Sequence, residues 1–206
     1  MLISEWEQYI SRKEGELALL VKQQQEFDRQ MQNLTYCKQC IEEAQVLLQG
    51  VAKQTQNRLS FHISNFVTGA LQSIWDEKAY RFTLEFIEKR NKTEVLMQLH
   101  TEEGTVSLEN LSLVRSGGGV LDVTALALRV ALWSLKNPKK HVMLLDQPLT
   151  NLDNEHIPLA GQLIQELSRK LGIQFIMVNH LALLNEYADT SLIVEKQDGI
   201  SVVRNL

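Results

Sequence analysis

The stretch HVMLLDQPLTNLD, residues 141–153, decides how the second half of the chain is interpreted. Four apolar residues lead directly to Asp146, and a polar turn that begins with Gln147 and Pro148 follows. A short apolar run bounded by turn residues is typical of a buried strand. Ligands of open α/β sheets bind beyond the carboxyl ends of the strands. Asp146 is therefore either a ligand for a cation such as Mg²⁺ or a carboxylate that caps the next turn.

Helix and strand patterns alternate on both sides of this stretch, which favours the α/β class with a mainly parallel sheet and helices packed on it. The sequence predicts a helix over 121–135, a strand over 141–146, a helix over about 156–171, a strand over 173–178 and a short helix near 181–187. Two hairpins are also expected. One joins alternating segments around 82–86 and 95–99 through the polar residues EKRNK, and the other turns on Asp198-Gly199.

Residues 2–58 are predicted to form one long helix with a coiled-coil seam, because apolar residues recur at heptad spacing. One heptad position holds Ile3, Ile10, Leu17 and Met31, and the other holds Trp6, Leu20, Phe27, Leu34, Ile41 and Leu48. Lys13, Gln24, Lys38 and Gln45 interrupt this seam. The alternative is a helix packed along a globular partner. Gly50 is a point where the helix is expected to loosen, and helical spacing resumes over 59–75.

The composition fits a globular protein, with 44% hydrophobic and 22% charged residues. The net charge of −4 provides no global basic field for nucleic acid, although a local basic patch is compatible with it. No run of eighteen apolar residues occurs and residues 1–20 have no signal-peptide core, so we expect no membrane span. Two cysteines do not make a disulfide framework, so a reducing, cytoplasmic location is expected. Cys37 and Cys40 have C-x-x-C spacing. A zinc site would need a second pair from another chain, so free thiols are the favoured interpretation.

Three further motifs lie where the predicted strands and helices meet. The sequence RSGGG, residues 115–119, precedes a helix, and such glycines let backbone N–H groups approach an anion closely. The sequence NLD, residues 151–153, follows the Asp146 strand, and His180 closes VNH after the next strand. Each motif alone is more often structural than functional. Parallel strands would nevertheless place His180 and Asp146 at the same edge of the sheet.

The order of all four elements is more specific than any one of them. A glycine-rich loop before a helix, an apolar strand ending in aspartate, an NLD turn and a strand ending in histidine resemble the C-terminal half of an ABC-type ATPase head. The resemblance is greatest to structural-maintenance-of-chromosomes (SMC) proteins and SbcC-like DNA repair and recombination ATPases, whose long coiled coil enters just before this half. It implies a coiled-coil helix over 1–58 and the C-terminal half of such a head over 59–206, with a mainly parallel sheet, flanking helices and β-hairpins.

The resemblance assigns the glycine-rich loop to the signature motif, usually LSGGQ or LSGGE. Ser116, Gly117 and Gly118 match this motif, whereas Arg115 and Gly119 depart from it. In the family, the signature loop contacts the γ-phosphate of ATP held by the opposite head. The three matching residues are therefore the expected cofactor-binding residues of this loop.

The resemblance also implies roles for the residues after the two strands. Asp146 matches the Walker B aspartate, which holds Mg²⁺. Asn151 and Asp153 match the D-loop, which reaches across the interface of a head dimer. His180 matches the switch histidine, which senses the γ-phosphate. ATP and Mg²⁺ are thus the expected cofactors.

Gln147 departs from the family, which has glutamate directly after the Walker B aspartate. A glutamine can hydrogen-bond the attacking water, but its amide is not a base at neutral pH. A well-placed general base contributes roughly 10²–10⁴-fold in rate. We therefore expect slow turnover and a long-lived ATP-bound dimer. Two origins fit the sequence, namely a natural head that closes but hydrolyses poorly and a substitution introduced to trap the ATP state.

No G-x-x-x-x-G-K-[ST] motif occurs in the 206 residues, so the phosphate cradle must come from elsewhere. The resemblance implies a Walker A-containing ATPase subunit or N-terminal half as partner, a head dimer with ATP at its interface, and DNA as substrate. A nuclease is a further candidate partner. The chain would be an ATPase only within this composite head, and weak or inactive alone. The alternatives are a non-catalytic interaction or inhibitor module that pairs with another ATPase head, and a plain coiled-coil assembly protein.

Overall fold

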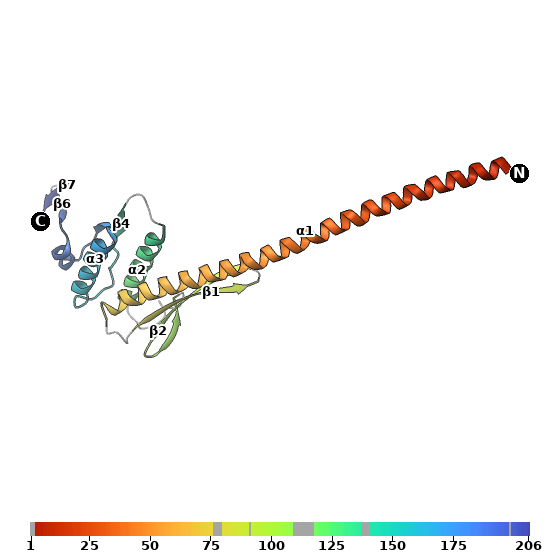
Figure 1. Cartoon of the computed structure of the whole chain (residues 1–206). Coiled ribbons are helices and arrows are strands. Elements are labelled where there is room, and N and C mark those ends of the chain that lie inside the picture. Colours follow the sequence, from red (N-terminus) through yellow and green to blue (C-terminus); the bar gives the residue numbers. More distant parts are fainter. Residues whose placement is uncertain (1–2, 76–79, 91, 109–117, 137–140, 198) are drawn as a thin grey trace. The chain divides into compact units, whose positions relative to one another are not determined.

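The computed structural model describes residues 3–75, 80–90, 92–108, 118–136, 141–197 and 199–206 (Figure 1). Its contacts divide the chain into two compact units, Met1–Thr55 and Gln56–Leu206. In chain order the elements are α1 (Ile3–Gln72), β1 (Arg81–Lys89), β2 (Lys92–Thr101), β3 (Gly104–Ser107), α2 (Gly118–Lys136), β4 (Val142–Asp146), α3 (Ile157–Leu171), β5 (Gln174–Val178), the 3-10 helix η2 (Ala182–Tyr187), β6 (Leu192–Gln197) and β7 (Ile200–Asn205).

Helix α1 is continuous over 70 residues and passes through Gly50 without a break. A single glycine costs a helix only about 0.5–1 kcal/mol relative to alanine, which the long helix tolerates. The described residues up to Thr55 are all exposed. The ten apolar residues of the predicted heptad seam are between 52% and 81% exposed in this chain. Cys37 and Cys40 are free and exposed as well.

The last part of α1 binds one edge of β1 through a row of hydroxyl groups, here called the hydroxyl ladder: Ser60, Ser64 and Thr68. Ser64 Oγ accepts from the Leu84 N–H at 2.9 Å, and Ser60 Oγ donates to the Leu84 carbonyl. Thr68 Oγ1 accepts from the Phe82 N–H at 3.0 Å and lies 3.2 Å from its carbonyl. The spacing of four residues places these hydroxyls on one helix face. The ladder therefore satisfies backbone groups at an edge that no strand covers among the described residues.

Strands β1, β2 and β3 form an antiparallel sheet in that order. The predicted hairpin is confirmed, but it is tighter than expected because Lys89 pairs directly with Lys92. Most of the EKRNK segment therefore lies within the strands. Strand β3 was not predicted, since its four residues, GTVS, carry little apolar alternation.

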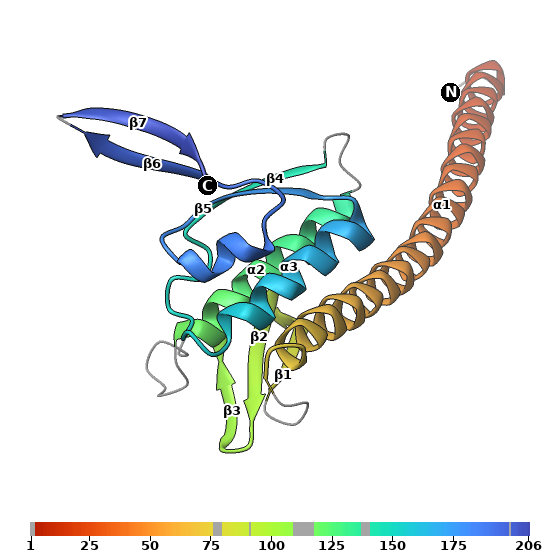
Figure 2. The same cartoon turned by 90° about the vertical axis from the view of Figure 1, so that its left-hand side faces the viewer.

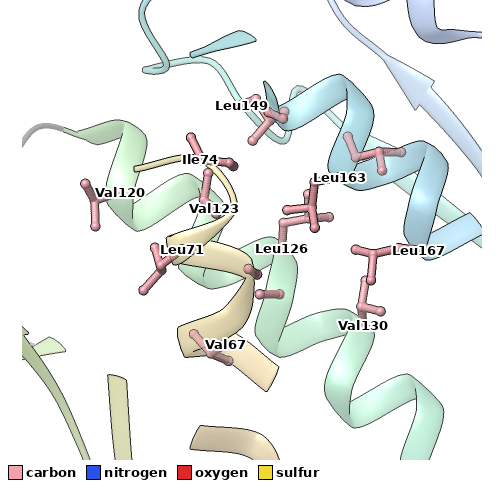
Figure 3. Close-up of a cluster of buried hydrophobic side chains, with 14 of the residues drawn as sticks. Val67, Leu71, Ile74, Val120, Val123, Leu126, Val130, Leu149, Leu163 and Leu167 are labelled. Carbon is pink, nitrogen blue, oxygen red and sulfur yellow. The ribbon is translucent and has the colours of Figure 1, made fainter. Parts of the chain in front are cut away.

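The core forms where the end of α1 meets α2 and α3. Figure 3 shows side chains of all three helices pointing toward one another. Among them, Val67, Leu71, Val123, Leu126 and Val130 are at most 1% exposed. Helix α2 is long and apolar enough to cross a membrane by length and composition. Most of its buried apolar residues belong to this core, and core packing accounts for the apolar character of that face.

Strands β4 and β5 are parallel, with Val142 opposite Gln174 and Asp146 opposite Val178. Figure 2 shows α2 and α3 side by side along one face of this pair. Met143, Leu145, Phe175 and Met177 point to the core, because alternate residues of a strand face opposite sides. The expectation of a mainly parallel sheet is met only in part, since β4–β5 is the one parallel pair in the described residues. The other two sheets are antiparallel.

The predicted elements around this pair are present with small shifts. Helix α3 has proline in its first turn and ends at Gly172, whose φ of 64° suits the left-handed cap. The segment after β5 forms the 3-10 helix η2. Strands β6 and β7 form the expected hairpin, with Gly199 at a φ of 86° in its turn. Asp198 lies outside the described residues.

Candidate functional site

Asp146 and Gln147 occupy the carboxyl end of β4, and both are exposed. The Gln147 N–H donates to the Val178 carbonyl at 2.8 Å, so the β4–β5 pairing continues one residue beyond the strand. Gln147 has a φ of 45°, in the left-handed region. A residue with a Cβ pays about 1–2 kcal/mol for this conformation. Such strain is concentrated at functional sites, where it fixes the direction of a side chain.

A hollow of about 520 Å³ runs along the outer edge of β4 and reaches Asp146. Consecutive residues from Met143 to Asp146 line it, although alternate residues of a strand face opposite sides. The hollow therefore follows the strand edge rather than one face. Arg129 and Lys136 of α2 also line it. Asp146 thus lies beside an accessible groove with two cationic side chains.

His180 lies two residues beyond β5 and is exposed. The Leu181 N–H donates to Asn179 Oδ1 at 2.8 Å, which turns the chain immediately after His180. Because β4 and β5 are parallel and adjacent, Asp146, Gln147 and His180 all follow the carboxyl edge of one strand pair. This is the edge at which α/β sheets bind ligands.

Asn151 is held against the start of α2 by Asp122. The Asn151 backbone N–H donates to Asp122 Oδ2 at 2.8 Å, and Asn151 Nδ2 lies 3.3 Å from the same oxygen. Gly118 and Gly119 make this approach close. A Cβ on Gly118 would lie 2.7 Å from the Asn151 Cβ, and one on Gly119 would lie 3.1 Å from the Asn151 carbonyl. The described end of the glycine-rich loop therefore packs directly on the NLD turn.

Asp153 is held on the other side of this turn by His156. His156 Nδ1 lies 2.5 Å from Asp153 Oδ1, and an ionised carboxylate can only accept, so the imidazole N–H donates. This hydrogen bond is the main reason why the pKa of the Asp153 carboxyl lies below its usual value. The His156 ring also packs on Trp75, with ring centroids 5.3 Å apart. Trp75 follows the end of α1, and its N–H donates to the carbonyl of Leu71 in that helix.

The predicted site residues thus fall into two groups in the structure. Asp146, Gln147 and His180 share one sheet edge, while Gly118, Asn151 and Asp153 lie around the NLD turn. Ser116 and Gly117 lie outside the described residues. Sequence reasoning did not identify Asp122, His156 or Trp75. The available signal for Asp122 was an acidic residue just after the first turn of the otherwise apolar helix α2.

The donor set fits magnesium only in part. No group of three or more His, Cys, Asp or Glu side chains that could hold a metal occurs in the described ranges. Asp146 nevertheless supplies an exposed carboxylate, and Mg²⁺ is commonly bound by one or two carboxylates together with water and substrate phosphates. The residues present therefore suit an ion that arrives with a phosphate-bearing ligand.

Comparisons with known proteins give the fold. No protein-family model matches the sequence, and no curated protein matches it. The fold is similar to a chain from a study titled "Structural biochemistry of ATP-driven dimerization and DNA stimulated activation of SMC ATPases", at 22% identity and a TM-score of 0.57. That match covers 75% of this chain and 89% of the other.

Two further matches are Smc heads from Pyrococcus species. The Smc head domain with a coiled coil and joint from Pyrococcus yayanosii gives 21% identity and a TM-score of 0.61, covering 80% of this chain and 31% of that one. The Pyrococcus furiosus head with an extended coiled coil, bound to the C-terminal domain of ScpA, gives 20% and 0.61, covering 80% and 40%. This chain therefore has the fold of an SMC-type ATPase head, and it spans less than half the length of these two proteins.

Proposed function

We propose that this chain, whose fold is that of SMC-type ATPase heads, is the C-terminal half of a split SMC/SbcC-like ATPase. It completes an ATP-gated head with a Walker A-bearing subunit or N-terminal half. The completed head acts in the cytoplasm on DNA, in repair, recombination or genome processing. Hydrolysis is slow because Gln147 replaces the catalytic glutamate.

The observation that carries this proposal is the uncovered outer face of β4–β5. Leu144 is 74% exposed, Val178 is 63% exposed and Ile176 is 49% exposed. Parallel sheets are normally covered on both faces, and their strands are apolar for that reason. An apolar outer face on a two-stranded parallel sheet is what remains when part of a larger sheet core is supplied by another polypeptide segment.

The hollow along β4 supports the same conclusion. Strand β4 pairs with β5 on one side, and within the described residues no strand pairs with its other edge. An unpaired strand edge is a template for another strand. The hollow follows this edge and includes Asp146, so a strand added there would meet the proposed nucleotide site.

The roles proposed for individual residues are those that the resemblance to SMC/SbcC-like heads implies. Asp146 would hold Mg²⁺, which supplies charge neutralisation for phosphate oxygens when it is bound. Gln147 would orient water, and His180 would contact the terminal phosphate from the same sheet edge. Ser116, Gly117 and Gly118 would bind the γ-phosphate of the opposite head. Asn151 and Asp153 would reach across the dimer interface.

The direct experiment compares ATP binding by this chain alone and with its partner. The full chain would be purified with the polypeptide that co-purifies, and mass spectrometry would test whether that polypeptide contains a G-x-x-x-x-G-K-[ST] motif. Light scattering with a fluorescent ATP analogue would then report binding and mass together. Binding and dimerisation only in the complex support the proposal. A complex with a Walker A partner that binds no ATP would overturn it.

A second candidate function is a non-catalytic module that pairs with another ATPase head. Gln147 favours it, because the base for hydrolysis is missing. The substitution Gln147→Glu separates the two. In the split ATPase it should raise the turnover of the complex by roughly 10²–10⁴-fold, the contribution of a general base. An unchanged rate in a complex that still binds ATP would favour the non-catalytic module.

A further inference from the structure

We propose that Asp122 and His156 are positioning residues that fix the NLD turn from two sides and so determine where Asn151 and Asp153 can reach. This inference rests on the proposed function for the meaning of that reach. Neither residue belongs to the motifs that the resemblance assigns. Together they connect the NLD turn to the start of α2 and to the end of α1.

The contact of Asp122 has the geometry of a clamp. Its carboxylate accepts both from the backbone N–H and from the side-chain amide of Asn151, at 2.8 and 3.3 Å. Two donors from one residue fix both the main chain and the direction of the side chain. Hydrogen bonds to a charged acceptor are about twice as strong as neutral ones. The clamp therefore orients the amide oxygen of Asn151 as well as placing its backbone.

The two glycines at the start of α2 allow the close approach to the NLD turn that the Asp122 clamp needs. Gly118 and Gly119 leave no room for a Cβ beside Asn151 and Leu152. The start of α2 and the NLD turn are consequently in backbone contact, and Asp122 lies one helical turn beyond that contact. A displacement at the described end of the glycine-rich loop must therefore displace Asn151 as well.

His156 fixes the second half of the turn by a different contact. Its backbone N–H and its Nδ1–H both donate to Asp153 Oδ1, at 3.1 and 2.5 Å. The imidazole ring is 22% exposed and rests on Trp75, which in turn packs edge-to-face on Tyr80 at 5.4 Å. Both bonds to Asp153 use one carboxylate oxygen. His156 therefore holds the Asp153 carboxylate through Oδ1 and makes no bond to Oδ2.

The first test uses hydrogen exchange of the Asn151 amide in the chain alone, so that neither nucleotide nor partner is required. Asp122→Asn should speed its exchange by about tenfold, the effect of losing a charge-assisted hydrogen bond. Asn151→Asp should do the same, because two carboxylates then face each other. The double exchange, Asp122→Asn with Asn151→Asp, should restore part of the protection, since the side-chain amide and carboxylate have changed places and the amide oxygen introduced at position 122 can still accept from the backbone N–H of residue 151.

Asp28→Asn, an exposed carboxylate on α1, is the matched control and should leave the exchange unchanged. If each substitution merely destabilised the fold, the double variant would exchange at least as fast as the single variants. Slower exchange of the residue 151 amide in the double variant therefore indicates a direct contact. Equal exchange rates in the wild type and in Asp122→Asn would overturn the Asp122 clamp. Two single variants that are both fast, with a double variant that is no slower, would overturn it as well.

The second test follows Trp75, one of three tryptophans in the chain. Replacing Trp6 and Trp133 by phenylalanine leaves Trp75 as the reporter. If His156 holds Asp153 to Trp75, assembly of the ATP-bound complex should change the Trp75 emission, and His156→Ala should abolish the change. If the Trp75 emission is the same before and after assembly, or if it still changes in His156→Ala, the His156 contact is not a positioning element.

The effect on turnover is measured in the complex that carries Gln147→Glu. Asp122→Asn should lower kcat by at least tenfold and leave the affinity for ATP unchanged, because the phosphate cradle belongs to the partner. An unchanged kcat would overturn the positioning role. A complex that binds no ATP while the exchange cycle still shows the clamp would overturn the proposed function and leave the clamp in place.

Discussion

The backbone at Gln147 shows how a single residue directs the candidate site. Its left-handed φ of 45° follows a regular strand, and its N–H is already bonded to the Val178 carbonyl. The chain therefore leaves the extended strand conformation at Gln147, and its side chain is exposed at the sheet edge. Glycine is the usual residue for such a conformation. A long polar side chain here costs folding stability, which indicates that the placement of the Gln147 side chain is functionally important.

Gln147→Gly should raise the free energy of unfolding, by up to about 1.5 kcal/mol. Relief of the left-handed strain contributes about 1–2 kcal/mol, and the greater entropy of unfolded glycine offsets about 0.5–1 of it. Urea unfolding followed by circular dichroism measures the change. Gln162→Gly in the exposed face of α3 is the control and should lower stability by about 1 kcal/mol. Equal losses in both variants would show that Gln147 is unstrained.

His156→Phe should return the pKa of Asp153 toward its usual value, because the His156 hydrogen bond is the main cause of the lowering. A lowered carboxyl pKa contributes stability above the unfolded value, about 3.9, and loses it as pH falls through the folded value. The wild type should therefore lose more stability than His156→Phe as pH falls below about 4.

A carboxyl ¹³C titration of Asp153 reports the pKa directly, and urea midpoints at several pH values report the stability. His141→Phe is a suitable control, because His141 packs edge-to-face on Trp133 and not on the NLD turn. If Asp153 titrates alike in the wild type and in His156→Phe, the hydrogen bond does not perturb the carboxyl.

The residues of the sheet edge were predictable from sequence, whereas their neighbours were not. Asp146 and His180 each follow an apolar run, and parallel strands end at one edge. Asp122 and His156 act through contacts to residues 29 and 3 positions away in sequence, at 2.8 and 2.5 Å. No periodicity encodes a contact between a helix start and a distant turn, so only the fold reveals the Asp122 clamp.

At the scale of elements, most helices and strands follow from apolar periodicity, and the exceptions have physical reasons. Helix α1 passes Gly50 because one glycine costs less than the flanking turns contribute. Strand β3 is too short to show alternation. The hydroxyl ladder was also not foreseen, since serines and threonines at spacing four are common on exposed helix faces. Their role depends on a strand that folds back beside them.

Ser64→Ala should lower the free energy of unfolding by about 1–3 kcal/mol. The Leu84 N–H, part-buried beside α1, would lose its acceptor, and an unsatisfied buried donor costs about that much. Thermal or urea unfolding measures the loss. Thr55→Val is the matched control, since the Thr55 hydroxyl bonds only its own helix at Val51 and is exposed. A loss no larger than that of the control would show that water replaces the ladder.

At the scale of the whole molecule, two apolar surfaces lack a cover among the described residues. One is the heptad seam on α1, and the other is the outer face of β4–β5. Large exposed apolar patches mark interaction sites in proteins that fold stably. Composition alone predicts neither surface, because an ordinary hydrophobic fraction does not show which apolar residues remain exposed to solvent. The seam was visible as a heptad pattern, whereas the exposed face of β4–β5 reads in sequence as a buried strand.

Leu144→Lys should reduce recovery of the Walker A partner by at least tenfold, because a charge would be buried without a counter-ion in the completed sheet. The stability of the chain alone should change by no more than about 0.5 kcal/mol, since the side chain is 74% exposed. Quantitative pull-down and melting temperature measure the two effects. Val194→Lys on β6, 65% exposed, is the control. Equal recovery of both variants would place the partner elsewhere.

The hydroxyl ladder has a further consequence when its spacings are compared. Between Ser64 and Thr68 the helix rises about 6 Å, and two residues of strand advance about 6.8 Å, so one helical step matches one strand step of two residues. The helix–strand contact therefore repeats every two residues along β1. A slip of β1 by two residues would preserve every face and offer the same hydroxyls equivalent backbone groups. The hydroxyls therefore determine which alternate residues of β1 bond to the helix, but not the register of β1 along it. Such a slip would move Phe82, whose ring is 1% exposed, out of its place in the core, so burial of this ring favours the observed register.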